Sequence, residues 1–529
     1  MSPLLTVAEQ SLYRATSRHE QVLQFIAALA PQSDLLAVQS MGQSGSGQDI
    51  PVLVLSRARA FTPAAAHALG VPVVLVLANI HAGEVEGKEC VLMLARDILT
   101  GPLARLIERA TLLLVPDYNP DGNDRIDPSH RQLDLVALEG QIGPECGVGT
   151  RNTAQGYNLN RDYIKLESIE ARQLAQLYGR WRPHLTVDCH TTNGSIHGYH
   201  LTFDTSHLLG SGPRGPVLYV RDVMLPRISR SLEQRTGHRT FFYGNFRNQD
   251  DPTQGWETYP GLPRFGSHYR GLTGRMDILL EAYSYIPFAD RCRVMYAILQ
   301  EILDDANQHG LEIVRLVRQA EDETVARGLH PQPDDLVGIN HAQIRRNGAG
   351  GIELSYPTHP LGEPVEILAW DLDSQRARRV PGDVLTRYRT TYYGAFVPAK
   401  SVRRPFAYLL PAAAARIAEH LRLHNLHVDT VARDFDVDVE SFVVHACERT
   451  ASKDIADQAP PETLFFGHWE VARATAQRGD FVVPMAQPFA HLAIYLLEPE
   501  SDDGLVQWGF FDHVRAGEWF PVRRIVAPT

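Results

Sequence analysis

Two side chains that bind metal ions well, His81 and Glu84, lie three positions apart directly after an apolar stretch. This stretch, Pro72 to Asn79, is rich in β-branched residues and predicts a buried strand that ends just before the pair. A histidine nitrogen and a carboxylate oxygen both approach zinc at roughly 2.0 to 2.2 Å, and a catalytic zinc site needs three protein ligands. The pair alone also fits ordinary turn residues before a helix, so a third ligand is needed.

Two further polar residues, His190 and Glu281, each follow a predicted strand in the same way as His81. In open α/β sheets, ligands collect outside the carboxyl ends of the strands. We therefore expect the three to meet at one sheet edge, with His190 as the third metal ligand and Glu281 as the general base. Taken singly, His190 also fits a hydrogen-bonded core histidine, and Glu281 a carboxylate paired with an arginine such as Arg275.

The elements that would position these residues alternate between strand and helix, which is typical of βαβ units and a parallel sheet. A hairpin precedes them, and the irregular segment from Asn123 to Thr150 is long enough to indicate a functional loop that lines the site. We predict an α/β fold, a mixed and largely parallel sheet flanked by helices. The predicted elements are a helix Gln21 to Ala30, hairpin strands Leu35 to Gln39 and Ile50 to Leu55, the strand Pro72 to Asn79, a helix Glu86 to Leu99, a strand Leu112 to Val115, a helix Ser168 to Arg182, a strand Leu185 to Cys189, a helix Gly215 to Thr236, a strand Met276 to Leu280 and a long helix Asp290 to Arg327.

The segment Leu329 to Asp335 contains two prolines that break the preceding helix, and it reads as a linker. We place a domain boundary there, with a large catalytic domain over residues 1–330 and a smaller mixed α/β domain over residues 336–529. In the second domain, Phe406 to Val428 predicts strand, helix and strand, and Phe481 to Leu497 is interpreted as alternating, strand-like sequence. We expect this domain to pack against the catalytic one; a sugar- or peptide-binding face is the alternative.

The composition is that of an ordinary globular protein of 529 residues, 44% hydrophobic and 21% charged, with a net charge of −11. An acidic balance argues against nucleic-acid binding, which needs a basic surface. No run of 18 apolar residues predicts a membrane span. The five cysteines have no paired spacing, which favours reduced thiols and a cytoplasmic location, or a periplasmic or secreted one if a leader has been removed.

Five motifs in order resemble the zinc carboxypeptidase family over roughly residues 8 to 325. They are His81-x-x-Glu84, Asn119-Pro120-Asp121-Gly122, Arg151 to Arg161 (RNTAQGYNLNR), Asp188-Cys189-His190 and Leu279-Leu280-Glu281. The resemblance implies that His81, Glu84 and His190 bind one Zn²⁺ per chain, and that Glu281 is the general base. It further implies that Arg151 stabilises the oxyanion, and that Asn160 and Arg161 hold the terminal carboxylate of the substrate.

The sequence departs from the digestive members of this family around the substrate pocket. Asp162 and Tyr163 follow the Asn-Arg pair where those members have Asn and Phe, and the tyrosine that closes over substrate has several matches. Among Tyr259, Tyr269 and Tyr283 we select Tyr269. We add Arg264 as a second substrate-binding candidate, since an arginine there could favour an acidic group; an ordinary ion pair is the alternative.

These features predict a zinc-dependent hydrolase of an amide bond next to a free carboxylate, that is, a metallocarboxypeptidase or a peptide amidase. A deacylase of N-acyl amino acids from the same superfamily is an alternative, as is a non-catalytic protein that holds a peptide or glycan. The expected partner is a peptide or an acylated amino acid. The sequence leaves the side-chain preference and the oligomeric state open.

Overall fold

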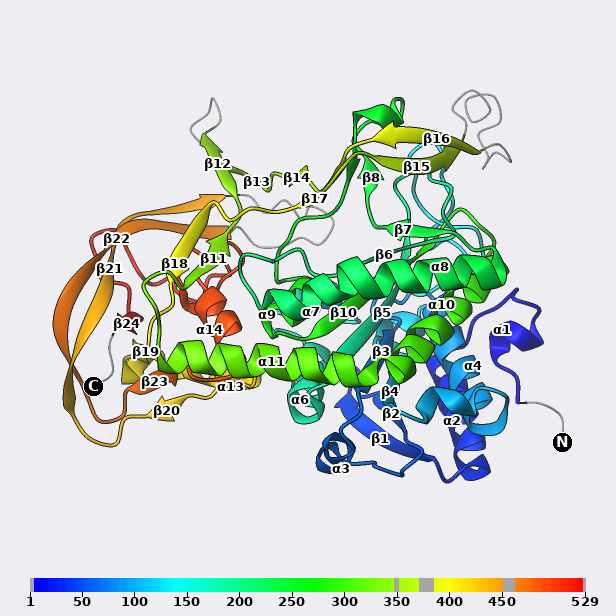
Figure 1. Ribbon diagram of the computed structural model, residues 1–529, viewed down its shortest axis with the longest axis horizontal. Helices are drawn as coiled ribbons and strands as arrows, with labels where there is room; N and C mark the ends of the chain where they lie inside the picture. The colour runs from blue at the N-terminus through cyan, green and yellow to red at the C-terminus, as the bar shows by residue number, and fades with distance from the viewer. Residues whose placement is uncertain (1–3, 347–351, 371–384, 451–461, 527–529) are drawn as a thin grey trace.

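A computed structural model describes residues 4–346, 352–370, 385–450 and 462–526 of the chain. Its largest element is an eight-stranded mixed sheet in the order β1-β2-β4-β3-β5-β10-β6-β7 (Figure 1). The four central strands, β4, β3, β5 and β10, run parallel to one another. The strands that flank them, β2 beside β4 and β6 beside β10, run antiparallel to these neighbours. The strands are β1 (Leu36–Gln43), β2 (Asp49–Leu55), β4 (Thr111–Val115), β3 (Val73–Ala78), β5 (Leu185–Thr192), β10 (Met276–Tyr283), β6 (Leu201–Asp204) and β7 (Thr240–Phe242).

The central strands are buried on both faces, which is why they read as continuous apolar runs. Along β3, Val74 and Val76 belong to one hydrophobic cluster, while Leu75 and Leu77 belong to another. The first cluster includes residues of α2 (His19–Leu29), α4 (Glu86–Thr100), α8 (Leu225–Thr236), α10 (Phe288–Gln308) and α11 (Gly310–Leu329); the second includes residues of α6 (Ile169–Trp181). The predicted α/β fold, a largely parallel sheet between helices, is confirmed.

Shorter elements complete this part of the chain. They include α1 (Val7–Gln10), α3 (Pro63–Ala68), α5 (Pro120–Asn123), α7 (Arg214–Tyr219), α9 (Gly266–Leu272), β8 (Asn245–Phe246) and β9 (Trp256–Glu257). The helix predicted over Gly215 to Thr236 is divided by a π-helical turn at Val220–Met224. The helix predicted over Asp290 to Arg327 is two helices, because α10 ends at Gln308 and α11 begins at Gly310 after His309.

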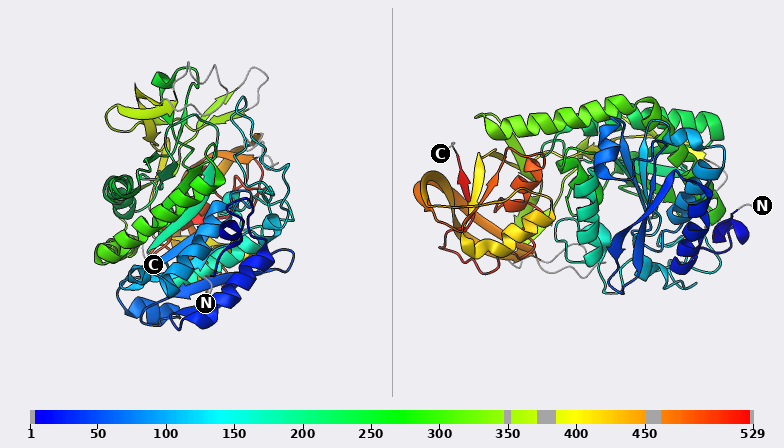
Figure 2. Two further views of the ribbon diagram at one scale, coloured as in Figure 1. Left: turned by 90° about the vertical axis from the view of Figure 1, so that its right-hand side faces the viewer. Right: turned by 90° about the horizontal axis from the view of Figure 1, so that it is seen from below.

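The residues after α11 form several smaller sheets (Figure 2). A six-stranded sheet has the order β20-β23-β19-β24-β21-β22, with α13 (Ala415–Leu423) and α14 (Ala490–Leu497) beside it. Its strands are β20 (Asp429–Thr430), β23 (Phe481–Pro484), β19 (Ala407–Leu410), β24 (Arg523–Ile525), β21 (Phe435–Thr450) and β22 (Glu462–Ala476); the remaining strands are β11 (Leu336–Asn340), β12 (Gln343–Arg346), β13 (Ile352–Ser355), β14 (His359–Pro360), β15 (Val365–Trp370), β16 (Leu385–Thr390), β17 (Tyr392–Ala395) and β18 (Lys400–Arg403).

The strand-like interpretation of Ala490 to Leu496 is wrong, because this segment is the helix α14. Every residue of α14 is buried and all but His491 are apolar, so the 3.6-residue period is hidden. A short, almost wholly apolar segment fits a buried helix and a buried strand equally well. Strand, helix and strand over Phe406 to Val428 are found as β19, α13 and β20, the last beginning at Asp429.

The segments on either side of the predicted linker contact each other directly. β17 pairs in parallel with β9, and His197 forms an isolated bridge with Ala369. Gly338 also donates a backbone hydrogen bond to Gly210. The boundary at residues 330–336 stays a prediction, but residues after it contact the segments that surround the eight-stranded sheet.

The described helices include none that is long and apolar enough to span a lipid bilayer. All five cysteines are free thiols, and three of them, Cys90, Cys189 and Cys292, are buried. Cys189 is 1% exposed and belongs to a hydrophobic cluster, so it packs as a small apolar core residue.

The buried sheet predicts a large difference between core and surface truncations. Leu113 of β4 is fully buried, so Leu113→Ala should lower the free energy of unfolding by about 2–5 kcal/mol and lower the thermal midpoint. The matched surface change Leu69→Ala, at a side chain that is 42% exposed, should stay within about 0.5 kcal/mol. Equal shifts of the two midpoints would contradict this account of the core.

Candidate metal centre

His81 and Glu84 lie in a tight turn at the carboxyl end of β3. Asn79, directly after the strand, has a positive φ of 64°, and its amide donates to Asp117 Oδ1 at 2.7 Å and to Asn123 Oδ1 at 3.1 Å. Asparagine tolerates this left-handed conformation better than most residues, and the buried amide contacts hold it. The Glu84 backbone N–H donates to the His81 carbonyl at 2.9 Å. Both side chains therefore leave one turn at the sheet edge.

His190 and Glu281 lie inside β5 and β10, whereas the sequence predicted that each would follow its strand. The prediction ended both strands where the apolar run ends, but ladder hydrogen bonds use the backbone, and threonine is well suited to strands. β5 and β10 stay paired as far as Thr192 and Tyr283. In this parallel register His190 is the direct partner of Glu281, so the two side chains lie next to each other.

The side chains of His81, Glu84 and His190 converge, with one ligand atom from each lying within 4.8 Å of the others. Nδ1 of His81 is 3.1 Å from Glu84 Oε1, and Nδ1 of His190 is 3.0 Å from Glu84 Oε2. All three are at most 4% exposed. The fold thus brings the predicted ligands together, although Glu84 and His190 lie 106 positions apart in the chain.

Hydrogen bonds determine which nitrogen of His81 faces this cluster as an acceptor. Asn158 Oδ1 accepts from the Asn160 backbone N–H at 3.0 Å, which identifies it as the amide oxygen. It therefore accepts from His81 Nε2 at 3.1 Å as well, and in the neutral ring Nδ1 carries the lone pair. An imidazole lone pair then faces a carboxylate that can only accept. Such a pair is stable when a cation lies between them.

Charge around the cluster agrees with this conclusion. Burial and then the Arg151 guanidinium lower the pKa of His81 to about 3, so its ring is neutral. Burial alone would favour neutral His190, but Asp188, Glu84 and Glu281 outweigh it and raise its pKa well above the usual range. Three carboxylates surround this position and favour positive charge. A His₂Glu donor set of this kind is typical of catalytic zinc sites, so the residues fit a metal ion.

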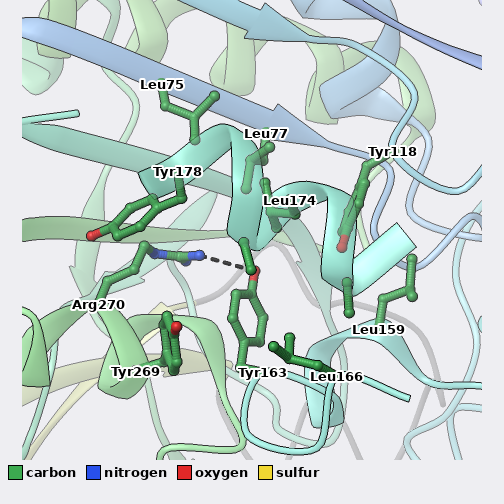
Figure 3. Close-up of a pocket in the computed structure, with 12 residues that line it drawn as sticks. Leu75, Leu77, Tyr118, Leu159, Tyr163, Leu166, Leu174, Tyr178, Tyr269 and Arg270 are labelled. Atoms are coloured by element: carbon green, nitrogen blue, oxygen red, sulfur yellow. Dashed lines mark hydrogen bonds between the residues drawn. The ribbon is translucent and has the colours of Figure 1, made fainter. Parts of the chain in front are cut away.

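A second layer of buried charges orients His190. Its Nε2 is 3.2 Å from Asp188 Oδ1, and the other Asp188 oxygen accepts from Arg270 Nη2 at 3.0 Å. Arg270 also pairs with Asp277 and donates to the Tyr163 hydroxyl at 2.9 Å, the contact drawn in Figure 3. A carboxylate behind a ligating histidine fixes its ring and raises its basicity. Burial disfavours ionised Asp188, yet His190 and Arg270 keep its pKa below the usual range.

The cluster opens into a cavity of about 930 Å³, which is in the size range of ligand sites. Glu281, Arg151, Asn160 and Arg161 all line it. Burial, reinforced by Glu84 and opposed by His190, raises the pKa of Glu281 to about 8. A carboxyl group with a pKa close to neutral is suited to proton transfer. The paired-carboxylate alternative involving Arg275 is not found, because Arg275 pairs with Glu321.

Three arginines line the cavity, and two of them contact the candidate metal ligands. Arg151 Nη1 is 3.0 Å from His81 Nδ1 and 3.7 Å from Glu84 Oε1. Arg161 lies over the Phe265 ring, with its guanidinium carbon 4.2 Å from the ring centroid. Asn160 Oδ1 accepts from the Gly266 backbone N–H at 3.1 Å. The oxygen of this amide is therefore used within the protein, and its nitrogen is the atom that can donate to a substrate. The third, Arg131, donates to Glu84 Oε1 at 3.0 Å.

The other two substrate candidates have different environments. Arg264 lines the cavity but is 3% exposed, and it forms ion pairs with Asp503 at 2.8 Å and Glu462 at 3.0 Å. Tyr269 is absent from the cavity lining; it lies instead beside Tyr163 and Arg270 (Figure 3), and its hydroxyl contacts His424 Nδ1 at 2.9 Å. The structure brings Tyr259 and Tyr243 to the cavity instead.

Several cavity residues were missed by the sequence analysis. Arg131 belongs to the loop predicted to line the site, but nothing in its spacing separates it from Arg125 in the same loop. Residues Leu354, Tyr356 and Glu462, from beyond the predicted linker, also line the cavity. They could not be found from sequence, because no motif connects them with the other cavity residues, which come much earlier in the chain.

The chain is similar in sequence to known carboxypeptidases. Residues 22–186 match the family model described as zinc carboxypeptidase, a span that includes His81, Glu84, Arg151 and Arg161. Carboxypeptidase 2 of Trichophyton equinum is 21% identical over 96% of this chain and 86% of its own length. Carboxypeptidase Z of Rattus norvegicus is 30% identical over 29% of this chain and 22% of its own length.

Among solved structures, a metallo-carboxypeptidase from Pseudomonas aeruginosa is 18% identical, with a TM-score of 0.39 over 56% of this chain and 70% of that one. A metallo-carboxypeptidase from Burkholderia cenocepacia has the same TM-score at 17% identity, over 55% of this chain and 69% of that one. Residues 22–186 of this chain are therefore similar to the zinc carboxypeptidase family, and the relatives found are carboxypeptidases.

Proposed function

We propose that this protein is a zinc-dependent hydrolase that cleaves an amide bond next to a free carboxylate, acting as a metallocarboxypeptidase on a peptide. The observation that carries the proposal is the convergence of His81, Glu84 and His190 beside Glu281 at one end of a cavity lined with arginines. The similar proteins are named as carboxypeptidases, which supports the same reaction class for this chain.

In this proposal His81, Glu84 and His190 hold one zinc ion per chain. When bound there, zinc would polarise the scissile carbonyl and make water a nucleophile at neutral pH. The turn after β3 and the strand β5 fix the donor atoms before the ion arrives, so little reorganisation is needed. Asp188 and Arg270 hold the His190 ring in the orientation that directs Nδ1 inward.

Glu281 acts as the proton carrier. It is the direct strand partner of His190 and faces the same cavity, so it lies beside the position where the ligand atoms meet. It accepts a proton from the attacking water and delivers it to the leaving amine. Arg151, whose guanidinium lies next to His81, donates to the carbonyl oxygen as negative charge develops on it.

Arg161 and Asn160 bind the substrate's free carboxylate. A planar guanidinium fork matches both oxygens of a carboxylate, and the Asn160 amide adds a donor. Stacking on Phe265 restricts the Arg161 side chain in advance, which reduces the conformational entropy lost on binding. The distance from this pair to the metal ligands then determines which amide bond is cut.

The substrate class is tested by comparing three compounds: a peptide with a free C-terminus, the same peptide amidated, and an N-acyl amino acid. We expect release of the C-terminal residue from the first and a loss of efficiency of about tenfold or more for the amide, because a hydrogen-bonded charge pair is lost. Release of a free acid from the third compound alone would identify a deacylase instead. No turnover of any of them would favour a binding protein.

The variant Arg161→Gln serves as the matched control for carboxylate recognition. It should raise KM for the free-acid peptide while leaving cleavage of the amidated peptide nearly unchanged. An equal effect on both peptides would show that Arg161 does not recognise the carboxylate.

The assignment of Glu281 is tested by measuring metal and activity together. Glu281→Gln should retain about one zinc per chain and lose hydrolysis by about 10²–10⁴-fold, because the carrier is removed while the ligands remain. His81→Ala should lose the zinc itself. Elemental analysis of purified protein and peptide hydrolysis report the two quantities. Full activity in Glu281→Gln would remove this residue from its role.

The layer behind His190 has its own test. Asp188→Asn keeps the shape of the side chain but removes the charge that orients the imidazole, so zinc affinity should fall by about 10–100-fold in a chelator competition. Asp322→Asn, at an exposed position of α11, is the control and should leave affinity unchanged. Equal affinities in the two variants would show that Asp188 does not support the metal site.

A further inference from the structure

An exposed pair of histidines, His445 and His468, lies on the neighbouring strands β21 and β22 of the six-stranded sheet. Nε2 of His445 is 2.7 Å from Nδ1 of His468. Figure 1 shows these two strands at the outer edge of the molecule, away from β3 and β5 of the candidate metal centre. The pair is therefore a second place where two metal-binding nitrogens meet, and neither residue lines the catalytic cavity.

A bulge in β21 brings the two rings together. The antiparallel register shifts between Val444 and Ala446, so His445 is an extra residue with no residue of β22 opposite it. The direct partner of His468 is Val443, two positions before His445. In a regular ladder, residues in this diagonal relation lie roughly 7–8 Å apart. A bulge redirects the side chain of the extra residue, which accounts for the short contact between the rings.

The hydrogen bonds of His468 determine which of its ring nitrogens can bind an ion. Its Nε2 is 2.8 Å from Glu470 Oε1, and an ionised carboxylate only accepts, so Nε2 carries the hydrogen. In the neutral ring Nδ1 then has the lone pair, and this lone pair faces His445. A carboxylate behind a histidine fixes the ring and raises its basicity. His468 is thus oriented as a ligand through Nδ1.

The separation of the two nitrogens is close to what one shared ion needs. Imidazole nitrogens at roughly 2.0 to 2.1 Å from a common ion are about 2.9 Å apart for an angle of about 90° at the ion, and about 3.3 Å apart in a tetrahedron. The observed 2.7 Å is closer to the first value. Angles near 90° are those of the square-planar and tetragonal sites that Cu²⁺ and Ni²⁺ prefer. Because both side chains are exposed, they are free to move apart slightly, and water can supply further ligands.

We propose that His445 and His468 bind a divalent transition-metal ion, with Cu²⁺ and Ni²⁺ as the best fits, in an exposed site on β21 and β22. The 2.7 Å contact is a hydrogen bond from His445 Nε2–H to His468 Nδ1. The ion takes the place of that hydrogen, and His445 then carries its hydrogen on Nδ1. The Glu470 carboxylate and the net charge of −11 attract a cation to this position.

This site has two protein ligands, one fewer than the candidate metal centre, so it binds its ion more weakly. It therefore loses the ion during purification more readily than the metal centre does. The inference is independent of the proposed hydrolase, because none of the three residues belongs to the catalytic cavity.

Calorimetric titration of the full-length, zinc-loaded protein with NiCl₂ tests the proposal, since the metal centre is then already occupied. One Ni²⁺ should bind per chain, and the zinc content measured afterwards should be unchanged. Glu470→Gln should weaken the binding by about tenfold, because the carboxylate behind His468 is lost. His445→Ala and His468→Ala should each weaken it more than this, because each removes one of the two protein ligands.

His427→Ala is the matched control. His427 is also an exposed histidine that pairs with a carboxylate two residues later, Asp429, at 2.9 Å. This variant should bind Ni²⁺ as tightly as the unchanged protein. Added Cu²⁺ should show coupling to two imidazole nitrogens by electron paramagnetic resonance in the unchanged protein, and coupling to no more than one in His468→Ala.

The variants lie at exposed positions, so their thermal midpoints without nickel should match that of the unchanged protein. The proposal is overturned if no Ni²⁺ binds to the zinc-loaded protein, or if Ni²⁺ binds only by displacing the zinc. It is equally overturned if either His445→Ala or His468→Ala binds Ni²⁺ as tightly as His427→Ala, since the ion would then lie elsewhere.

Discussion

The contact on which this molecule's chemistry depends is between the Glu84 carboxylate and the Nδ1 atoms of His81 and His190, at 3.1 and 3.0 Å. These groups are buried, and the Asn158 contact makes the His81 nitrogen an acceptor like the carboxylate itself. Bringing acceptors together at a largely buried position is costly unless positive charge lies between them. The arginines Arg131 and Arg151 reduce the cost from outside, and a metal ion bound by all three ligands would remove it. The cluster is therefore best understood as a site built for a cation.

The parallel pairing of β3, β5 and β10 is what creates this contact. Because Ala78 is aligned with Cys189 and Glu281 with His190, the proposed metal ligands and the proposed base meet at one edge of the sheet. The sheet is buried on both faces, so its register is fixed by the core and small shifts are resisted. Behind the ligands, Asp188 and Arg270 extend the same rigidity into a chain of buried charges. The catalytic geometry is in this sense a consequence of the core.

Much of this arrangement could be predicted from the sequence, because the chemistry lies on strands whose apolar runs are easily recognised. The strand before His81 was predicted within a residue at each end, and His81, Glu84, His190 and Glu281 followed from their places near strand ends. Predictions failed where one sequence pattern fits more than one structure. The fully buried helix α14 has the apolar sequence of a buried strand. β5 and β10 continue through His190 and Glu281, past the end of the apolar residues that marked them in the sequence. Tyr269 could not be distinguished from Tyr259 by sequence, since only the fold decides which one faces the cavity. Long-range contributions such as Tyr356 and Glu462 have no local signal at all.

The most direct measurement of the central claim is the position of the metal in a crystal of the purified protein, determined by anomalous diffraction at the zinc absorption edge. The account predicts one strong anomalous peak, at roughly 2.0 to 2.2 Å from Nδ1 of His81, Nδ1 of His190 and a Glu84 oxygen, with Glu281 facing it without ligating. A peak coordinated by other residues, or a fully active protein with no peak at this position, would contradict it.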